Sequence, residues 1–274
     1  MTMIRKAAVA GSWYPGTAAA LAAAVDRHLA GATRDVGGDL VALIAPHAGL
    51  MYSGPVAAHA YHLLRGRTFD VAVLVGPSHF VGFEGVAVHP PGGFETPYGV
   101  MPIDADCAAR LRKTSTMIVD HPHAHVREHS LEMQLPFLQR LAPDVPIVPL
   151  VMGYQKAETA RALGDALSDA LRDRKALLIA STDLSHYHDA ATAEHLDRIV
   201  IDRVAAFDAD GLQRALDARP EHACGGGPTV AVMRAARQLG ARDAVVLDYA
   251  DSGDVSGDKS AVVGYLAAAL GTFL

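Results

Sequence analysis

The stretch Leu43-Ile-Ala-Pro-His-Ala-Gly49 joins the end of an expected strand to a histidine, and the predicted fold follows from it. Residues 40–45 form a short apolar run with β-branched members, which is typical of a strand buried in a sheet. Pro46 ends the run because proline cannot donate a hydrogen bond to a neighbouring strand. His47 therefore follows the carboxyl end of a strand, the edge at which open α/β sheets bind ligands. A single histidine at such a place is more often a loop residue bonded to the backbone, but the pattern recurs.

Two further apolar runs end in polar segments that carry histidine. Residues 70–76 lead into Pro77-Ser-His79, and residues 176–180 lead into a segment that carries Asp183 and His186. If the three strands are parallel neighbours, the three segments meet over one edge of the sheet. Imidazole is the commonest protein ligand for zinc, iron and copper, so the recurrence indicates a metal site. The alternative is that these side chains only cap helices and fix loops.

Expected strands alternate with expected helices along the rest of the chain. Additional strands are predicted near residues 145–151 and 244–248, whereas residues 260–270 fit either a strand or a helix. This alternation predicts a single-domain α/β sandwich over residues 1–274. Its central sheet is expected to be largely parallel, with some antiparallel strands, and to be flanked by helices.

Three local predictions depend on glycine, proline and apolar spacing. Pro55 suits the first turn of a helix that would run to about residue 64. Glycines and prolines throughout residues 90–102 are typical of an irregular loop. Residues 130–141 have the apolar spacing of a helix.

Composition excludes several classes of protein. The chain has 274 residues, half of them hydrophobic, and a net charge of −6, which argues against a nucleic-acid partner. No apolar run is long enough to cross a membrane, and no signal peptide is evident. The two cysteines make no disulfide framework, so we expect a reduced, cytoplasmic protein.

Cys224 precedes three glycines and Pro228, an arrangement that predicts the start of a helix. The positive end of a helix macrodipole favours the thiolate, and a thiolate is a metal ligand. The alternative is a small buried apolar side chain, as cysteine often is. Cys107 fits that alternative better, because it lies inside the predicted helix 105–113.

Residues 128–136 offer a carboxylate and an imidazole at helical spacing. Within the predicted helix, His129 and Glu132 lie near one face, where they would position substrate or bond to a ligating histidine. Ser130 is otherwise explained as a helix cap. The alternate spacing of three histidines just before this segment is typical of a solvated loop rather than a metal site: His121, His123 and His125.

Six short motifs occur in order over nearly the whole chain: Ala10-Gly-Ser-Trp-Tyr14, Ala45-Pro-His-Ala-Gly49, Gly76-Pro-Ser-His79, Glu128-His-Ser-Leu-Glu-Met133, Ser181-Thr-Asp-Leu-Ser-His186 and Cys224-Gly225. Together they resemble the Memo family. Bacterial members are often described as one component of a three-part "AmmeMemoRadiSam" system, which implies AMMECR1-like and radical SAM partner proteins. The family is similar in fold to class III extradiol dioxygenases, non-haem iron enzymes that open catechol rings.

The resemblance implies that three side chains hold one metal ion: His47, His79 and Cys224. We expect iron or copper, with zinc as the alternative. It also implies that the acid–base residue His186 lies beside the metal with Asp183, and that Trp13 lines the cleft. We expect the substrate to contact three side chains: Trp13, His129 and Glu132. The dioxygenases complete their metal site with a carboxylate, whereas here a softer thiolate takes that place, which puts ring cleavage in doubt.

Three functions are compatible with this site. The first is a metal-dependent oxidoreductase that acts on a small aromatic or redox-active substrate. The second is a module that binds a phosphotyrosine peptide or another acidic or aromatic ligand without catalysis, as the resemblance also suggests. The third is a zinc hydrolase, because two imidazoles, one thiolate and a water form an acceptable zinc site.

Overall fold

The structure is a computed structural model that describes residues 3–274. Its helices are α1 (Ala18–Gly31), α2 (Leu50–His62), α3 (Ala105–Thr114), α4 (Leu135–Leu141), α5 (Ala157–Leu171), α6 (Ala190–Ala205), α7 (Ala209–Ala218), α8 (Gly226–Gln238) and α9 (Gly253–Ser256). Its strands are β1 (Met3–Arg5), β2 (Gly38–Ala45), β3 (Val71–Pro77), β4 (Val86–Val88), β5 (Gly92–Thr96), β6 (Gly99–Pro102), β7 (Ile118–Asp120), β8 (Ile147–Met152), β9 (Ala176–Ser181), β10 (Asp183–His188), β11 (Asp243–Asp251) and β12 (Val262–Phe273). Short 3-10 helices cover Pro122–His125, Glu132–Gln134 and Pro220–His222.

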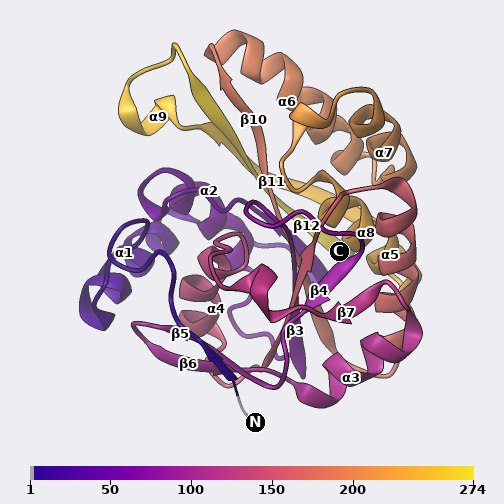
Figure 1. Cartoon of the computed structure of the whole chain (residues 1–274). Coiled ribbons are helices and arrows are strands. Elements are labelled where there is room, and N and C mark those ends of the chain that lie inside the picture. The colour runs from indigo at the N-terminus through magenta and orange to yellow at the C-terminus, as the bar shows by residue number, and fades with distance from the viewer. Residues whose placement is uncertain (1–2) are drawn as a thin grey trace.

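A mixed nine-stranded sheet forms the centre of the molecule (Figure 1). Its strand order is β10-β12-β2-β9-β3-β8-β4-β7, and β11 also pairs with β12. The strands β2, β9, β3 and β8 run parallel to one another. Strand β12 is antiparallel to β10, β2 and β11, and β4 is antiparallel to β8. The α/β prediction is confirmed, with antiparallel strands on both sides of a parallel centre.

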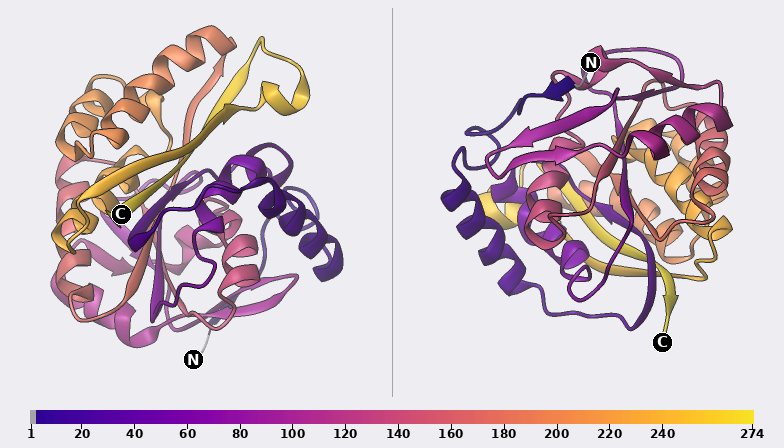
Figure 2. Two further views of the ribbon diagram at one scale, coloured as in Figure 1. Left: turned by 180° about the vertical axis from the view of Figure 1, so that it is seen from behind. Right: turned by 90° about the horizontal axis from the view of Figure 1, so that it is seen from below.

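Side chains of the central strands alternate between two apolar cores, one on each face of the sheet. In β3, Val71, Val73 and Val75 face one core, while Ala72 and Leu74 face the other. Helices α3, α5, α6, α7 and α8 cover the first face, and α1, α2 and α4 cover the second. Figure 2 shows these two groups of helices on opposite sides of the sheet. Burial on both faces explains why the strands read as continuous apolar runs.

The predicted loop at residues 90–102 is wrong, because this segment forms the hairpin of β5 and β6. These two strands and β1 form a second, three-stranded sheet. The glycines that suggested a loop instead allow close strand approach. A Cβ on Gly92 would lie 1.8 Å from the carbonyl oxygen of Met3. Gly99, with φ +111°, sits at the turn.

Two helix boundaries also differ from the prediction. Helix α2 begins at Leu50 rather than Pro55, because the Gly49 carbonyl accepts hydrogen bonds from the amides of Tyr52 and Ser53 at 2.8 and 3.1 Å. In the segment 130–141 the α-helix begins only at Leu135, since Pro136 takes one of its first positions. The residues before it are irregular or 3-10 helical.

Two further segments, one ambiguous and one expected as a loop, form strands. The ambiguous segment at residues 260–270 is the long strand β12, which borders β2, β10 and β11. The polar segment 181–186, expected as a loop, is largely the strand β10.

No helix among residues 3–274 is long and apolar enough to cross a membrane.

Candidate metal centre

Three neighbouring strands bring the expected residues to one edge of the sheet. Strand β9 lies between β2 and β3, parallel to both, so the chain leaves all three at the same edge. After β9 the chain crosses the end of β2, where the Thr182 amide donates to the Ala45 carbonyl at 3.0 Å. The Asp183 carboxylate then accepts the amide N–H of His47 at 2.7 Å. The predicted convergence of the histidine-bearing segments is confirmed.

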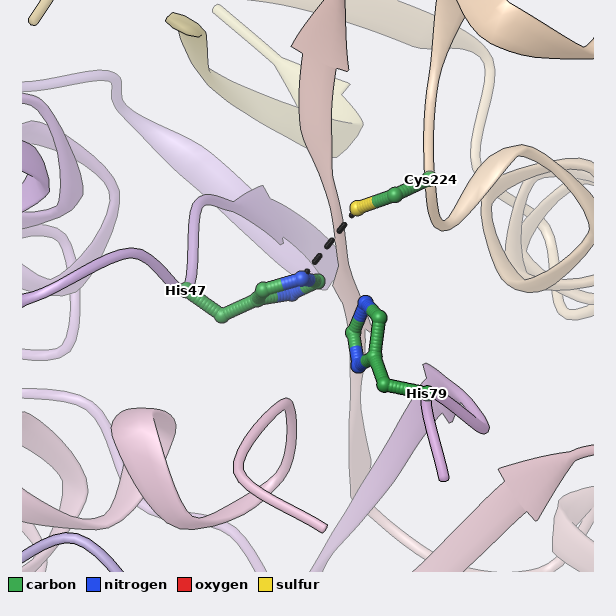
Figure 3. Close-up of side chains that lie close together, drawn as sticks. All are labelled: His47, His79 and Cys224. Carbon is green, nitrogen blue, oxygen red and sulfur yellow. Dashed lines mark hydrogen bonds between the residues drawn. The ribbon is translucent and has the colours of Figure 1, made fainter. Parts of the chain in front are cut away.

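His47, His79 and Cys224 lie together at this edge (Figure 3). One nitrogen from each imidazole and the Cys224 sulfur all lie within 4.8 Å of one another. The sulfur is 3.2 Å from His47 Nε2. His47 follows β2, His79 follows β3 and Cys224 precedes α8. The sheet edge therefore brings together residues that are far apart in the sequence.

Hydrogen bonds determine which nitrogen of His47 carries the proton. The Ser181 hydroxyl donates its only proton to the Ser130 carbonyl at 2.7 Å and accepts from Gln134 Nε2 at 2.7 Å. Gln134 is oriented by Tyr61, whose hydroxyl donates to Oε1 at 2.8 Å. Ser181 Oγ, 2.8 Å from His47 Nδ1, must therefore accept a hydrogen bond from that nitrogen. His47 Nε2 is left with its lone pair directed toward Cys224.

His79 is oriented in the same way by a carboxylate. Its Nδ1 lies 2.8 Å from Glu128 Oε1, and its amide N–H donates to Oε2 of the same side chain at 2.6 Å. Burial opposes ionisation of Glu128, but the hydrogen bonds and charge of His79 outweigh it and lower the pKa of this carboxyl to about 2. Carboxylates that hold the outer nitrogen of a ligating histidine are usual in metal sites. His79 Nε2 is thereby free to bind a metal.

Without a bound metal, His47 is neutral and the Cys224 thiol keeps its proton. Burial lowers the pKa of His47 well below its usual value, and the charge of nearby His79 lowers it further. Burial and the charge of Asp183 raise the pKa of the Cys224 thiol well above its ordinary value. The expected thiolate at a helix amino end is therefore wrong in the absence of metal. Burial of the thiol opposes its ionisation, and Cys224 lies outside α8, two residues before its first residue Gly226.

An aromatic group borders the three donors. The His129 ring stacks on His79 at 4.4 Å between centroids and lies 4.4 Å from Trp13 and 5.9 Å from Phe80. Burial, together with the charges of His47 and His79, lowers the pKa of His129 to about 4. Trp13 and Phe80 are both partly exposed. The expected position of Trp13 beside the site agrees with this geometry. Phe80 also borders the site, which the sequence did not predict.

Asp183 and His186 come from β10, which crosses behind the donors. Asp183 is buried, and this burial raises the pKa of its carboxyl, although the hydrogen bond from His47 opposes the shift. The charge of His186 lowers the pKa of both Asp183 and His47. His186 is half-buried.

Glu132 lies in a different place from the one predicted. It is fully buried, and its carboxylate bonds to the N-terminal segment of the chain. The carboxylate that orients His79 belongs to Glu128, for which the sequence predicted no such role. The error came from assuming a regular helix over residues 130–141. Glu128 could have been found from its place directly before His129 in a loop rich in ligand-type residues.

The histidine-rich segment 121–125 is not uniformly solvated. His123 is exposed, as expected, but His125 is fully buried. Its ring lies 5.3 Å from that of His89 and 5.9 Å from that of Phe94. Cys107, by contrast, is buried within α3 as predicted.

The family is established by comparison with known proteins. The sequence model for "Memo-like protein" matches residues 5–269. The chain belongs to the Memo-like family. A MEMO1 family protein of Methanothermobacter thermautotrophicus is 41% identical to this Memo-like chain over 273 residues, covering 96% of the chain and 99% of the relative. A MEMO1 family protein of Methanopyrus kandleri is 39% identical, covering 97% and 98%.

One solved structure supports the fold alone. An uncharacterized protein of Escherichia coli K12 superimposes with a TM-score of 0.54 at 19% identity, covering 83% of the Memo-like chain and 99% of the E. coli chain.

Proposed function

We propose that the protein binds one iron or copper ion through His47, His79 and Cys224 and acts as an oxidoreductase on a small aromatic or redox-active substrate. One observation carries the proposal. Each imidazole has its Nδ1 engaged by an oriented partner, so that both Nε2 atoms remain available beside the sulfur. A set of two nitrogens and one sulfur leaves further coordination positions for substrate or oxygen.

The donor set fits a redox metal. Neutral imidazole suits iron, copper and zinc, and thiolate is softer than the carboxylate of the usual iron triad. Between iron and copper, the sulfur therefore favours copper. Bound here, either metal would supply one-electron transfer to or from an aromatic substrate or oxygen.

The protein's own residues would bind the substrate and move its proton. Trp13 and His129 offer ring faces against which a planar molecule could stack. His186 would take a proton from a substrate hydroxyl or return one, since an imidazole exchanges protons near neutral pH. Asp183 holds the His47 backbone and would orient the groups around it.

The test combines metal content with oxygen consumption. Protein purified without added metal is analysed for iron, copper and zinc, then loaded anaerobically with Fe(II) or Cu(I) and exposed to oxygen with catechols. The proposal expects oxygen uptake that Cys224→Ala abolishes and Cys107→Ala, a change at the other cysteine, preserves. No uptake with any diphenol or thiol reductant would overturn it.

The donor set also favours a second candidate, a zinc hydrolase. Two imidazoles and a thiolate leave a fourth position for water on zinc, whose bound water loses a proton near neutral pH. Purification with zinc alone and hydrolysis of ester or amide probes would support this function. Iron or copper in the purified protein would exclude it.

A further inference from the structure

A buried ion pair connects the N-terminal segment to the metal centre. Arg5 on β1 pairs with Glu132, and the side chains are only 3% and 0% exposed. Removing one partner of such a pair leaves an uncompensated buried charge, which strongly destabilises the folded protein.

Arg5 holds the backbone of the segment that carries Glu128. Its Nε donates to the His125 carbonyl at 2.8 Å, and its Nη2 donates to the Glu128 carbonyl. Its Nη1 donates to the Glu132 carboxylate. The planar guanidinium thus joins three points of residues 125–132, a geometry that a lysine ammonium cannot reproduce. Glu128 in turn holds His79 through both its amide and its ring.

Glu132 holds the segment that carries Trp13. Its carboxylate accepts hydrogen bonds from the amides of Ala8 and Val9 at 2.8 and 3.1 Å and from the Tyr14 hydroxyl at 2.6 Å. The Trp13 amide donates to the Val9 carbonyl at 2.9 Å. Holding Val9 and Tyr14 therefore fixes the backbone on both sides of Trp13, whose ring lies against His129.

We infer that Arg5 and Glu132 are positioning residues for the metal centre. Arg5 acts through Glu128 on the ligand His79, and Glu132 acts through the backbone of residues 8–14 on Trp13. This inference rests on metal binding by the proposed site, but not on the identity of the metal or on any reaction. It gives Glu132 a function other than the substrate contact expected from the sequence.

Zinc affinity and Trp13 fluorescence test the inference together. Trp13 is the only tryptophan, so the emission of the protein reports on this residue alone. Zinc, which is redox-silent, is titrated in competition with a chelator. Glu132→Gln, which leaves Arg5 without its charge partner, should weaken zinc binding by about tenfold, the lower end for residues that support metal ligands. The emission of Trp13 should shift to the red, and its indole ring should become more accessible to the quencher acrylamide.

Milder and matched variants distinguish positioning from general destabilisation. Tyr14→Phe removes a single hydrogen bond between Glu132 and the segment that carries Trp13. It should give the same change in Trp13 fluorescence at smaller size, even if Glu132→Gln does not fold. Arg140→Lys alters an exposed pair with Asp26 that does not touch residues 125–132, and should change neither. Leu212→Ala removes a buried side chain of α7 and should lower the melting temperature without affecting zinc affinity.

The outcomes separate this inference from the proposed function. If the unmodified protein binds no zinc, iron or copper, the proposed function fails and the inference falls with it. If the unmodified protein binds zinc but Tyr14→Phe leaves Trp13 emission unchanged, only the inference fails. The same holds if a folded Glu132→Gln leaves both zinc affinity and Trp13 emission unchanged. The inference fails as well if Leu212→Ala weakens zinc binding as much as Glu132→Gln does.

Discussion

The position of single protons decides whether the two imidazoles can share a ligand. His47 gives its Nδ1 proton to the Ser181 hydroxyl, whose own proton is already donated to the Ser130 carbonyl. His79 gives its Nδ1 proton to the Glu128 carboxylate. The residues that do this, Ser181 and Glu128, are buried and hydrogen-bonded on all sides.

We predict that Ser181→Ala lowers metal affinity by roughly 10- to 100-fold, the usual effect of losing a partner of a ligating histidine. Without the hydroxyl, His47 loses the acceptor that keeps the proton on Nδ1. Competition titration with a chelator measures the change. Ser168→Ala, which removes a hydrogen-bonded serine from α5, serves as the control and should bind metal like the unmodified protein. Equal affinities for Ser181→Ala and the control would contradict the assigned proton position.

Metal binding should also release the proton of Cys224. Because burial and the charge of Asp183 raise the pKa of this thiol, the metal-free protein holds it protonated at neutral pH, and a metal must displace the proton. Affinity should therefore rise about tenfold per pH unit, with about one proton released per metal bound. Calorimetry in two buffers of different ionisation enthalpy measures the release. Cys224→Ser should not show this release, and a value near zero in the unmodified protein would refute the prediction.

His125 should make stability depend on pH. Burial lowers its pKa to about 3, with a further contribution from the charge of His89. The stabilisation is complete above the unfolded value near 6.5 and is lost as the pH falls from 6.5 toward 3, because only the unfolded chain takes up the proton. At pH 5 the loss amounts to about 2 kcal/mol. Denaturant unfolding of His125→Phe should show a flatter pH profile than that of the exposed-site control His123→Gln.

At the scale of elements, the site depends on the segment between β9 and β10, which crosses the end of β2 and bonds to it. This crossing lies under the start of α8, where the Gly225 amide donates to Thr182 Oγ1 at 3.0 Å. A Cβ on Gly225 would lie 2.2 Å from the Ser181 carbonyl oxygen and 2.7 Å from Thr182 Cβ. The glycine after Cys224 is therefore required for the close approach of α8 to the crossing.

We expect Gly225→Ala to push α8 away from the crossing and to displace the adjacent sulfur. Metal affinity should fall at least tenfold, because ligand geometry is lost together with packing. Gly31→Ala is a suitable control, since nothing lies within 4 Å of the added carbon at the end of α1. Competition titration and thermal melting measure both effects. A Gly225→Ala protein that binds metal normally would show that the close approach does not position Cys224.

At the scale of the whole molecule, the sequence predicted what depends on apolar periodicity. The buried runs ending at Ala45 and Gly76 identified the strands, and their shared direction placed His47 and His79 together. The strand β10 could not be recognised, since its residues are polar and only its pairing with β12 defines it, with register shifts along the way. Glu128 was missed for a related reason, because tertiary contacts rather than helix spacing direct it toward His79.

Anomalous diffraction at the iron, copper and zinc absorption edges, from crystals grown with each metal, tests the central claim most directly. The account predicts one peak, bonded to His47 Nε2, His79 Nε2 and Cys224 Sγ, with a metal–sulfur distance of about 2.3 Å if zinc is bound. A crystal of Cys224→Ser should lose the sulfur bond. A peak at any other group of residues, or a metal at this edge without the sulfur among its ligands, would contradict the account.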